Sequence, residues 1–459
     1  MEELDCFFYP ESVAVIGASN QPKSIGKALL ENFFSTRLAI KVFPVNPNHA
    51  TILGKKAFPS VKSIPAKVDL AIVAVPAKAV PMVLRECIEK KVGGAIIISA
   101  GFAEIGEKKL TAEIQKIISK NPGTRVIGPN CFGVYNSFNG LNSTFSESRK
   151  MGYPKKGKVA FISQSGALGV ALLDWISSQE FGLSKFVSYG NAMDVDESDL
   201  VEYFKRDKQT KVLAMYIEGV KKGRKFFKVA RETSLRMPIV ALKGGMNKET
   251  HNATASHTGS LAGSVEVYEA LFRQTGIIQA YDLIDLFSFA KTLENEPLPK
   301  GNRVLIITNG GGYGIVTADQ VVGNCLKLAG FSRGNEKLLR KAFPRTVTVS
   351  NPLDLVGDAD DKRYKQAILA GLREKKIDIL LVLILFNTPA IDKKIVKELI
   401  EIKKKAKKPL LVVTIGSEYT IERSRELERG GVIVFKYPSV AAKSIKALVD
   451  YAEFRRQNH

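Results

Sequence analysis

The chain has 459 residues, 45% of them hydrophobic and 25% charged, and its formal net charge at pH 7 is +22. That length is too great for one hydrophobic core and predicts roughly three domains. The composition is that of an ordinary globular protein, and because no apolar run is long enough to cross a bilayer, we expect no membrane association. The N-terminal residues lack the apolar core of a signal peptide, which predicts a cytoplasmic location.

The positive charge is spread along the chain. Lysine pairs or triplets occur at residues 108–109, 155–156, 221–222 and 403–405. No aromatic residues alternate with them, as a nucleic-acid stacking platform would require, so we expect no nucleic-acid partner. The charge instead favours polyanionic ligands or an acidic partner protein. The four cysteines form no C-x-x-C pair, and we expect no metal site.

The N-terminal part repeats one pattern, in which a short β-branched run ends in turn residues and a helical stretch follows. This alternation is typical of a parallel sheet with crossover helices. Each run is apolar enough to be buried on both faces. The predicted strands are residues 12–17, 41–45, 70–75, 95–99 and 125–127.

Two polar segments without periodicity, at residues 142–158 and 294–302, predict linkers. The same β–α alternation resumes after each of them. The predicted strands are residues 159–163, 185–189, 212–217 and 239–242, then 303–307, 377–386, 410–415 and 432–435, with a final helix at 440–454. We therefore predict an α/β protein of three doubly wound parallel-sheet domains, at 1–145, 157–295 and 301–459.

The second and third predicted domains resemble each other where their first helices begin. Gly166 corresponds to Gly311 at an offset of 145 residues, and the same offset relates Gly169 to Gly314 and Asp174 to Asp319. We interpret these matches as a weak internal repeat.

In the first predicted domain, the strand ends carry residues suited to a phosphate-bearing ligand. Gly17, Ser19 and Lys23 follow the first strand, but the G-x-G-x-x-G pattern of a dinucleotide turn is absent. Asn46 follows the second strand, where NAD would need an acidic residue for its ribose. The rim is completed by Val75, Pro76 and Ser99.

Two glycine-rich turns open helices in the later domains. They are S-Q-S-G-A-L-G at residues 163–169 and T-N-G-G-G-Y-G at residues 308–314. Small residues let the N–H groups at a helix start approach an anion, and the helix dipole favours negative charge there. The two turns predict a phosphate held between two helix starts.

His257 lies in a loop of small residues between these turns, with no bulky neighbour to bury its imidazole. A histidine presented in this way is a candidate nucleophile near neutral pH. Glu218 follows the predicted strand at 212–217, at the edge where ligands bind. Its carboxylate can accept a hydrogen bond from one imidazole nitrogen and leave the other nitrogen nucleophilic.

The order of these motifs resembles the α subunit of ADP-forming acyl-CoA synthetases, relatives of succinyl-CoA synthetase. The motifs are G-P-N-C-F-G at residues 128–133, S-Q-S-G-A-L-G at 163–169, Y-I-E-G at 216–219, S-H-T-G-S-L-A-G at 256–263 and N-P-L-D at 351–354. The resemblance covers the whole chain. It implies a Rossmann-like coenzyme A-binding domain followed by two flavodoxin-like domains.

The resemblance also implies a role for each group of residues. His257 would carry a phosphoryl group, with Glu218 as its orienting carboxylate. Asn130 and Gln164 would lie near an acyl phosphate, and the helix starts at Ser165, Gly166, Gly310 and Gly311 would hold the phosphate. Coenzyme A would bind around Gly17, Ser19, Lys23, Asn46, Val75, Pro76 and Ser99.

Two features refine what the resemblance implies. The succinyl-CoA enzymes resemble G-P-N-C-P-G and S-R-S-G, whereas Phe132 and Gln164 stand here. The loss of a cation near the acyl pocket favours a monocarboxylic acid. We find no ATP-grasp segment, so we expect ADP, ATP and Mg²⁺ to bind a separate ATP-grasp β subunit, in an α2β2 assembly, while acyl-CoA and phosphate bind this chain.

Two other functions compete with this interpretation. An NAD-dependent dehydrogenase would explain the Rossmann-like start, but the incomplete glycine pattern argues against it. A non-catalytic protein that senses acyl-CoA would leave the pairing of His257 with Glu218 unexplained.

Overall fold

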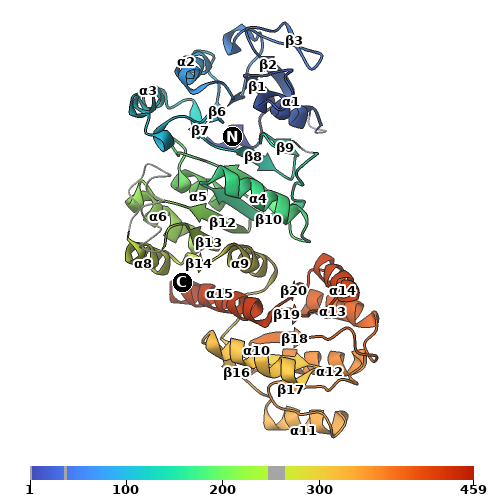
Figure 1. Cartoon of the computed structure of the whole chain (residues 1–459). Helices are drawn as coiled ribbons and strands as arrows, with labels where there is room; N and C mark the ends of the chain where they lie inside the picture. The colour runs from blue at the N-terminus through green and yellow to red at the C-terminus, as the bar shows by residue number, and fades with distance from the viewer. Residues whose placement is uncertain (1–2, 36–38, 148, 247–263, 459) are drawn as a thin grey trace. The chain divides into compact units, whose positions relative to one another are not determined.

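The computed structural model describes residues 3–35, 39–147, 149–246 and 264–458. The chain divides into two compact units, Met1–Gln279 and Ala280–His459. Both are built from parallel sheets with helices between the strands (Figure 1). Because β-branched runs are buried on both faces of such sheets, the sequence shows continuous apolar strands. The α/β class predicted from the sequence is confirmed.

The first sheet of unit Met1–Gln279 has five parallel strands in the order β2-β1-β5-β6-β7. The strands are β1 (Ser12–Ile16), β2 (Lys41–Val45), β5 (Leu70–Val73), β6 (Gly94–Ile97) and β7 (Arg125–Ile127), with helices α1 (Ile25–Ser35), α2 (Val80–Glu89) and α3 (Lys108–Ser119). A short hairpin, β3 (Thr51–Ile52) and β4 (Lys55–Lys56), follows β2. All five predicted strands are confirmed, with ends that differ by at most two residues.

The second sheet of this unit has the order β14-β13-β12-β10-β11-β8-β9. Its strands are β8 (Gly133–Asn136), β9 (Leu141–Asn142), β10 (Lys156–Ser163), β11 (Leu183–Ser188), β12 (Val212–Ile217), β13 (Ile239–Lys243) and β14 (Ile278–Ala280). The helices are α4 (Gly166–Ser177), α5 (Glu197–Arg206), α6 (Gly223–Ser234) and α8 (Val265–Thr275). β8 pairs antiparallel with β11 and β9. The expectation of a purely parallel sheet is therefore wrong at this edge.

Unit Ala280–His459 has one parallel sheet in the order β16-β15-β18-β19-β20, with β17 paired to β15. The strands are β15 (Arg303–Thr308), β16 (Lys327–Leu328), β17 (Leu353–Asp354), β18 (Ile379–Leu383), β19 (Leu410–Val413) and β20 (Ile433–Phe435). The helices are α9 (Leu283–Asn295), α10 (Gly311–Gly323), α11 (Arg333–Ala342), α12 (Asp361–Arg373), α13 (Lys394–Lys405), α14 (Glu418–Arg429) and α15 (Pro438–Gln457). α9 packs against α15. The three domain boundaries stay a prediction.

The two glycine-rich turns have the same local structure. β10 ends at Ser163 and β15 at Thr308, and both strands are followed by a helix that begins three residues later. The Ser163 hydroxyl donates to the Ser165 carbonyl at 2.7 Å, and the Thr308 hydroxyl donates to the Gly310 carbonyl at 3.1 Å. This shared geometry supports the internal repeat.

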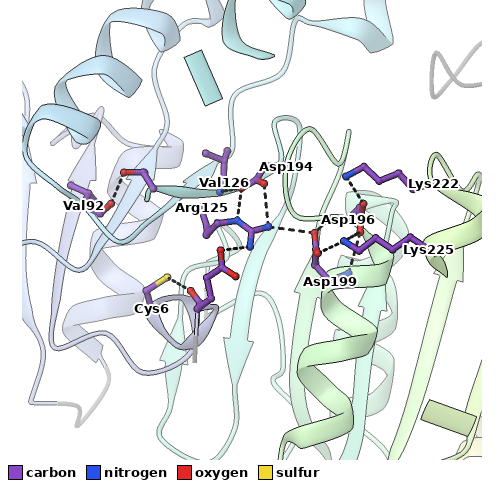
Figure 2. Close-up of polar contacts among 11 residues, drawn as sticks. Cys6, Val92, Arg125, Val126, Asp194, Asp196, Asp199, Lys222 and Lys225 are labelled. Carbon is purple, nitrogen blue, oxygen red and sulfur yellow. Dashed lines mark hydrogen bonds and ion pairs between the residues drawn. The ribbon is translucent and has the colours of Figure 1, made fainter. Parts of the chain in front are cut away.

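Arg125 on β7 joins the two sheets of unit Met1–Gln279 (Figure 2). Its guanidinium donates to both carboxylate oxygens of Asp194, at 2.9 and 3.1 Å, and reaches Asp199 on α5 at 3.4 Å. Lys225 on α6 pairs with the same Asp199 at 2.5 Å. The network holds the end of the first sheet against the helices of the second.

Within the part of the chain that the structure describes, no helix combines the length and the apolar character needed to cross a membrane.

Candidate functional site

The turn after β1 is tightly packed. Gly17 has φ +91°, and its N–H donates to the Val45 carbonyl at 3.0 Å. A Cβ on Gly17 would lie 2.2 Å from the Ala74 carbonyl oxygen, and one on Gly26 would lie 2.0 Å from the Gly17 oxygen. Only glycine fits at either position, since the end of β1 lies against the Ala74 carbonyl and α1 begins directly against the end of β1. This close approach places the start of α1 at the carboxyl end of β1.

The predicted binding side chains near this turn also brace it. Asn46 donates to the Ala18 carbonyl at 2.8 Å, and the Ser19 hydroxyl accepts from the Gln21 N–H at 2.9 Å. Lys23 lines a 460 Å³ cavity. The other residues of this cavity are Pro22, Ser24, Lys27, Ala28, Glu31, Glu147, Arg149 and Lys150. Four cations and two carboxylates thus surround the space beside α1.

The remaining rim residues connect this sheet to the loop at 128–133. The Ser99 hydroxyl donates to the Val75 carbonyl at 2.5 Å, and Pro76 is exposed. The Asn130 N–H donates to the Ser99 carbonyl at 2.9 Å. The structure therefore brings Val75, Ser99 and Asn130 together, although they come from three different loops.

Gln164 and Glu218 meet at the carboxyl edge of the second sheet. The Gln164 side-chain oxygen accepts from the N–H groups of Glu218 at 2.7 Å and of Gly219 at 3.1 Å. Gln164 is 8% exposed, as is Glu218. The side chain predicted to contact an acyl phosphate thus fixes the backbone that carries the predicted orienting carboxylate.

The start of α4 lies beside the loop at 128–133. The Ser165 hydroxyl caps the helix by accepting from the Leu168 N–H at 3.3 Å. A Cβ on Gly166 would lie 3.6 Å from the Phe132 Cβ, and the Phe132 N–H donates to the Ser188 hydroxyl at 3.0 Å. The helix start predicted to hold phosphate therefore lies within the same region as Asn130 and Gln164.

Glu218 lies among polar side chains that were not predicted as site residues. Tyr216 forms a side-chain hydrogen bond to Glu218. Burial lowers the pKa of the nearby Lys243, and the Glu218 carboxylate partly offsets that effect. The Lys243 ammonium lies 4.7 Å from the centre of the Tyr268 ring. Tyr216 could have been predicted from the sequence because it belongs to the Y-I-E-G motif, whereas Lys243 belongs to no such motif.

A second buried pair lies near this edge. Tyr189, directly after β11, and Glu197, the first residue of α5, are 0% and 1% exposed. The Tyr189 hydroxyl and one Glu197 carboxyl oxygen have no hydrogen-bond partner in the described structure. Burial raises the pKa of Glu197 to about 7, with a further contribution from Asp196.

The remaining predicted site residues are Gly310, Gly311 and His257. Gly310 and Gly311 open α10 in unit Ala280–His459, as predicted. A Cβ on Gly311 would lie 2.6 Å from a carboxylate oxygen of Asp354, so a negative charge already lies beside this helix start. His257 falls outside the described residues, and its pairing with Glu218 stays a prediction.

Among the described residues, no group of three or more His, Cys, Asp or Glu side chains is arranged to hold a metal ion.

Three family models match consecutive parts of the chain. A CoA binding domain matches residues 11–137, a succinyl-CoA ligase like flavodoxin domain matches 156–293, and a Ligase-CoA domain matches 304–455. Together they span both units. They support coenzyme A binding and do not favour the dehydrogenase alternative.

Relatives extend over the whole chain. The alpha subunit of acetate–CoA ligase [ADP-forming] II from Pyrococcus furiosus is 41% identical, with 98% of both chains covered. Acetate–CoA ligase [ADP-forming] from Methanocaldococcus jannaschii is 38% identical, and the match covers 98% of this chain and 63% of that protein. A solved acetyl-coenzyme A synthetase of Ca. Korarchaeum cryptofilum, in complex with phosphate and ADP, has a TM-score of 0.92 at 36% identity, and the match covers 99% of this chain and 98% of that chain. The chain belongs to the family of ADP-forming acetate–CoA ligase alpha subunits.

Proposed function

We propose that the chain is the α subunit of an enzyme that converts acyl-CoA, ADP and phosphate reversibly into a carboxylic acid, ATP and coenzyme A. The observation that carries the proposal is the match to the P. furiosus alpha subunit over 98% of both chains. The Korarchaeum structure, solved with phosphate and ADP, supports the same reaction.

The reaction would proceed in three group transfers. A phosphate oxygen attacks the thioester carbon, the C–S bond breaks, and coenzyme A leaves as acyl phosphate forms. A His257 nitrogen then attacks phosphorus, which releases the carboxylate and leaves a phosphohistidine. ADP finally accepts the phosphoryl group and regenerates the imidazole. Each step exchanges one reactive bond for another, so the protein contributes mainly positioning and charge neutralisation.

Glu218 and Gln164 would act together at the second step. The carboxylate would accept from one imidazole nitrogen and stabilise the cation that develops on the other side of the ring. Gln164 would hold that carboxylate in place, because its oxygen binds the N–H groups of Glu218 and Gly219.

The phosphate would bind at the helix start of Ser165 and Gly166, Gly310 and Gly311 would form a second phosphate-binding helix start, and Asn130 would lie near the acyl phosphate. Of the two starts, α10 is the weaker anion site, since the Asp354 carboxylate beside Gly311 offsets its dipole.

The coenzyme would bind at the first sheet's carboxyl edge. The tightly packed, glycine-dependent turn at Gly17 and the cationic cavity that includes Lys23 fit a phosphate-rich ligand. Ser19, Asn46, Val75, Pro76 and Ser99 form the adjoining rim. We assign this edge to coenzyme A, within a domain at 1–145 that is followed by domains at 157–295 and 301–459.

The acid would be acetate or another monocarboxylic acid. Two related proteins are named for acetate, and Gln164 supplies no cation to a second carboxylate. The amide oxygen of Gln164 is already occupied by backbone N–H groups.

A β subunit would supply the nucleotide site. The P. furiosus relative is named an alpha subunit, and the M. jannaschii protein extends well beyond the matched region, which covers 63% of it. We propose an ATP-grasp partner in an α2β2 assembly in the cytoplasm. Mg²⁺ bound there with ADP or ATP would neutralise phosphate charge during the last transfer.

Labelling tests the proposal. The purified chain, incubated with acetyl-CoA and radiolabelled phosphate, should acquire an acid-labile label, and addition of the partner subunit and ADP should move that label into ATP. His257→Ala should abolish labelling, whereas His251→Ala, six residues earlier in the sequence, should keep it. Absence of label on the wild-type chain with its partner, or equal label on His257→Ala, would overturn the proposal and leave an acyl-CoA sensor as the better explanation.

A further inference from the structure

Three side chains form a hydrogen-bonded chain between the two sheets of unit Met1–Gln279. The Asn191 amide nitrogen donates to a Glu104 carboxylate oxygen at 2.6 Å. The Asn130 amide nitrogen donates to the Asn191 amide oxygen at 3.4 Å. Glu104 follows β6 of the first sheet and Asn191 follows β11 of the second, so the hydrogen bonds run from Glu104 through Asn191 to Asn130.

The backbone fixes all three residues. Glu104 accepts from the N–H groups of Gly101 at 2.5 Å and Phe102 at 3.1 Å through its other oxygen. The Asn191 N–H donates to the Pro129 carbonyl at 3.0 Å. Asn130 has φ +58°, and its carbonyl lies 2.3 Å from where a Cβ on Gly190 would be. The backbones of the two loops that carry Asn130 and Asn191 therefore pack closely against each other.

Glu104 determines which groups donate and which accept in this series of hydrogen bonds. Burial alone would raise its pKa, but hydrogen bonds from Gly101 and Asn191 hold the pKa of Glu104 below its usual value. The ionised carboxylate only accepts hydrogen bonds. Asn191 must therefore direct its NH₂ group to Glu104 and its oxygen to Asn130. Asn130 in turn must direct its NH₂ group to Asn191, which leaves its own amide oxygen for the ligand.

With its amide oxygen left for the ligand, Asn130 can bind only a ligand that carries a hydrogen-bond donor. Phosphate and acyl phosphate are anions and present mainly acceptor oxygens, which an amide oxygen does not bind. The end of coenzyme A that reacts carries donors, namely the thiol S–H and the amide N–H groups of its pantetheine arm. Asn130 also binds the Ser99 carbonyl, on the rim proposed for the coenzyme.

We propose that Glu104 and Asn191 are positioning residues that turn the Asn130 amide oxygen toward the reactive arm of coenzyme A, from which it accepts a hydrogen bond. The inference rests on the proposed function, since it takes coenzyme A as the ligand. Asn130 then places the thiol end of the coenzyme, and the phosphate is left to the helix start at Ser165 and Gly166.

The proposal is tested by exchanging the carboxylate of Glu104 and the amide of Asn191, first one at a time and then together. In Glu104→Gln, two NH₂ groups face each other, or both asparagines flip and turn a donor toward the ligand. In Asn191→Asp, two carboxylates face each other. In the double variant, the glutamine introduced by Glu104→Gln can still accept from Gly101 and Phe102 while its NH₂ group donates to the new carboxylate, which also accepts from Asn130. The order of donors and acceptors is restored.

The measurement is calorimetric binding of coenzyme A, desulfo-coenzyme A and adenosine 3′,5′-bisphosphate to the full chain. Each single variant should bind coenzyme A about fivefold more weakly, as expected for one lost hydrogen bond, and the double variant should recover to within about twofold of wild type. Adenosine 3′,5′-bisphosphate, which lacks the pantetheine arm, should bind all variants equally. Glu107→Gln, an exposed change in the same segment, is the matched control and should bind coenzyme A normally.

Desulfo-coenzyme A distinguishes the two donors. If the thiol is the donor, this ligand binds wild type and single variants alike; if an amide N–H is the donor, it shows the same fivefold loss. Single variants that bind coenzyme A like wild type, a double variant no better than the worse single one, or an equal loss for the bisphosphate would each overturn the proposal. Binding that follows the expected pattern in a chain that acquires no phosphate label would overturn the proposed reaction instead.

Discussion

At the scale of single residues, Gln164 shows how one buried side chain can fix the backbone of a site. Its oxygen binds two backbone N–H groups at the end of a neighbouring strand. A methionine of similar length would leave both N–H groups buried without an acceptor. We expect Gln164→Met to lower the free energy of unfolding by about 2 kcal/mol, measured by urea denaturation.

Gln179→Met provides the matched control for this change. Gln179 is exposed and donates to the Ser178 hydroxyl at 3.0 Å. Its replacement should alter the free energy of unfolding by less than about 0.5 kcal/mol. Equal effects of the two substitutions would show that the hydrogen bonds of Gln164 add nothing to stability.

Glu197 predicts a pH dependence of stability. Its pKa is raised by burial to about 7 in the folded protein, from a usual 4.5. A raised carboxyl pKa stabilises the fold at low pH, and this contribution is lost as pH rises through about 4.5 to 7. Above that range, folding must bury a charged carboxylate. Glu197→Gln, which stays neutral, should therefore gain up to about 3 kcal/mol over wild type between pH of about 4.5 and 8.

The measurement is the free energy of unfolding of wild type and Glu197→Gln across that pH range. The comparison uses the difference between the two proteins, because other carboxylates affect both equally. A difference that does not change with pH would mean that Glu197 is ionised throughout, in contradiction to its burial.

At the scale of elements, the turn after β1 depends on how closely the end of β1 approaches the end of β5. Gly17→Ala would place a Cβ 2.2 Å from the Ala74 carbonyl oxygen at a φ of +91°. Backbone at the centre of a sheet cannot move aside, so we expect a loss of about 3 kcal/mol or more in the free energy of unfolding. Coenzyme A binding should fall with it, measured by calorimetry.

Gly54→Ala separates the strain of the φ angle from the clash. Gly54 has φ +73° and no atom within 4 Å of an added Cβ. Its substitution should lower the free energy of unfolding by about 1 kcal/mol, from the strain of the positive φ angle alone. If Gly54→Ala were as harmful as Gly17→Ala, the close contact of Gly17 with the Ala74 carbonyl would not explain the glycine.

The Arg125 network predicts how firmly the two sheets of unit Met1–Gln279 are joined (Figure 2). Arg125 is 13% exposed and binds Asp194 through two nitrogens. Arg125→Met would leave that carboxylate partly buried without its cation, and we expect a loss of about 3 kcal/mol in thermal or urea unfolding.

Arg85→Met is the control for Arg125. Arg85 pairs with Glu113 at 2.8 Å, but both side chains are about half exposed, at 51% and 44%. An exposed pair of this kind contributes about 0–1 kcal/mol. A loss at Arg125 no larger than the loss at Arg85 would show that the network does not hold the sheets together.

Elements that depend on local sequence were predicted well, and those that depend on distant pairing were not. β2 and β7 match their predicted ranges because β-branched runs are bounded by turn residues. β8 and β9 were missed, since the segment around them carries Asn, Ser and Gly, and its strands form by pairing: β8 with β11, and β9 with β8.

The same division applies to the site. Gln164 and Glu218 were placed at one edge, because parallel strands end on the same side of a sheet. Their hydrogen bond could not be predicted, since it depends on the register of β10 against β12. Glu104 and Asn191 were missed altogether, as 87 residues separate them and neither belongs to a recognised motif.

At the scale of the whole molecule, the net charge of +22 predicts that electrostatic attraction increases the association rate constant of coenzyme A. A positive protein attracts a phosphate-rich ligand over distances near the Debye length, which shortens as salt is added. We expect the association rate constant of coenzyme A to fall about tenfold between about 20 and 300 mM KCl. The dissociation rate constant should change far less, because contacts in the bound state are screened less. Stopped-flow fluorescence measures both.

Sucrose at matched osmolality provides the control, since it changes water activity without screening charge. An association rate constant that is insensitive to KCl would mean that the scattered lysines do not act on the ligand. A fall in rate confined to variants that retain Lys23 and Lys27 would instead assign the attraction to the cavity beside α1, where both line the wall. The uniform spread of lysines along the sequence favours a long-range effect of the whole charge, so the salt dependence should persist when these two lysines are replaced.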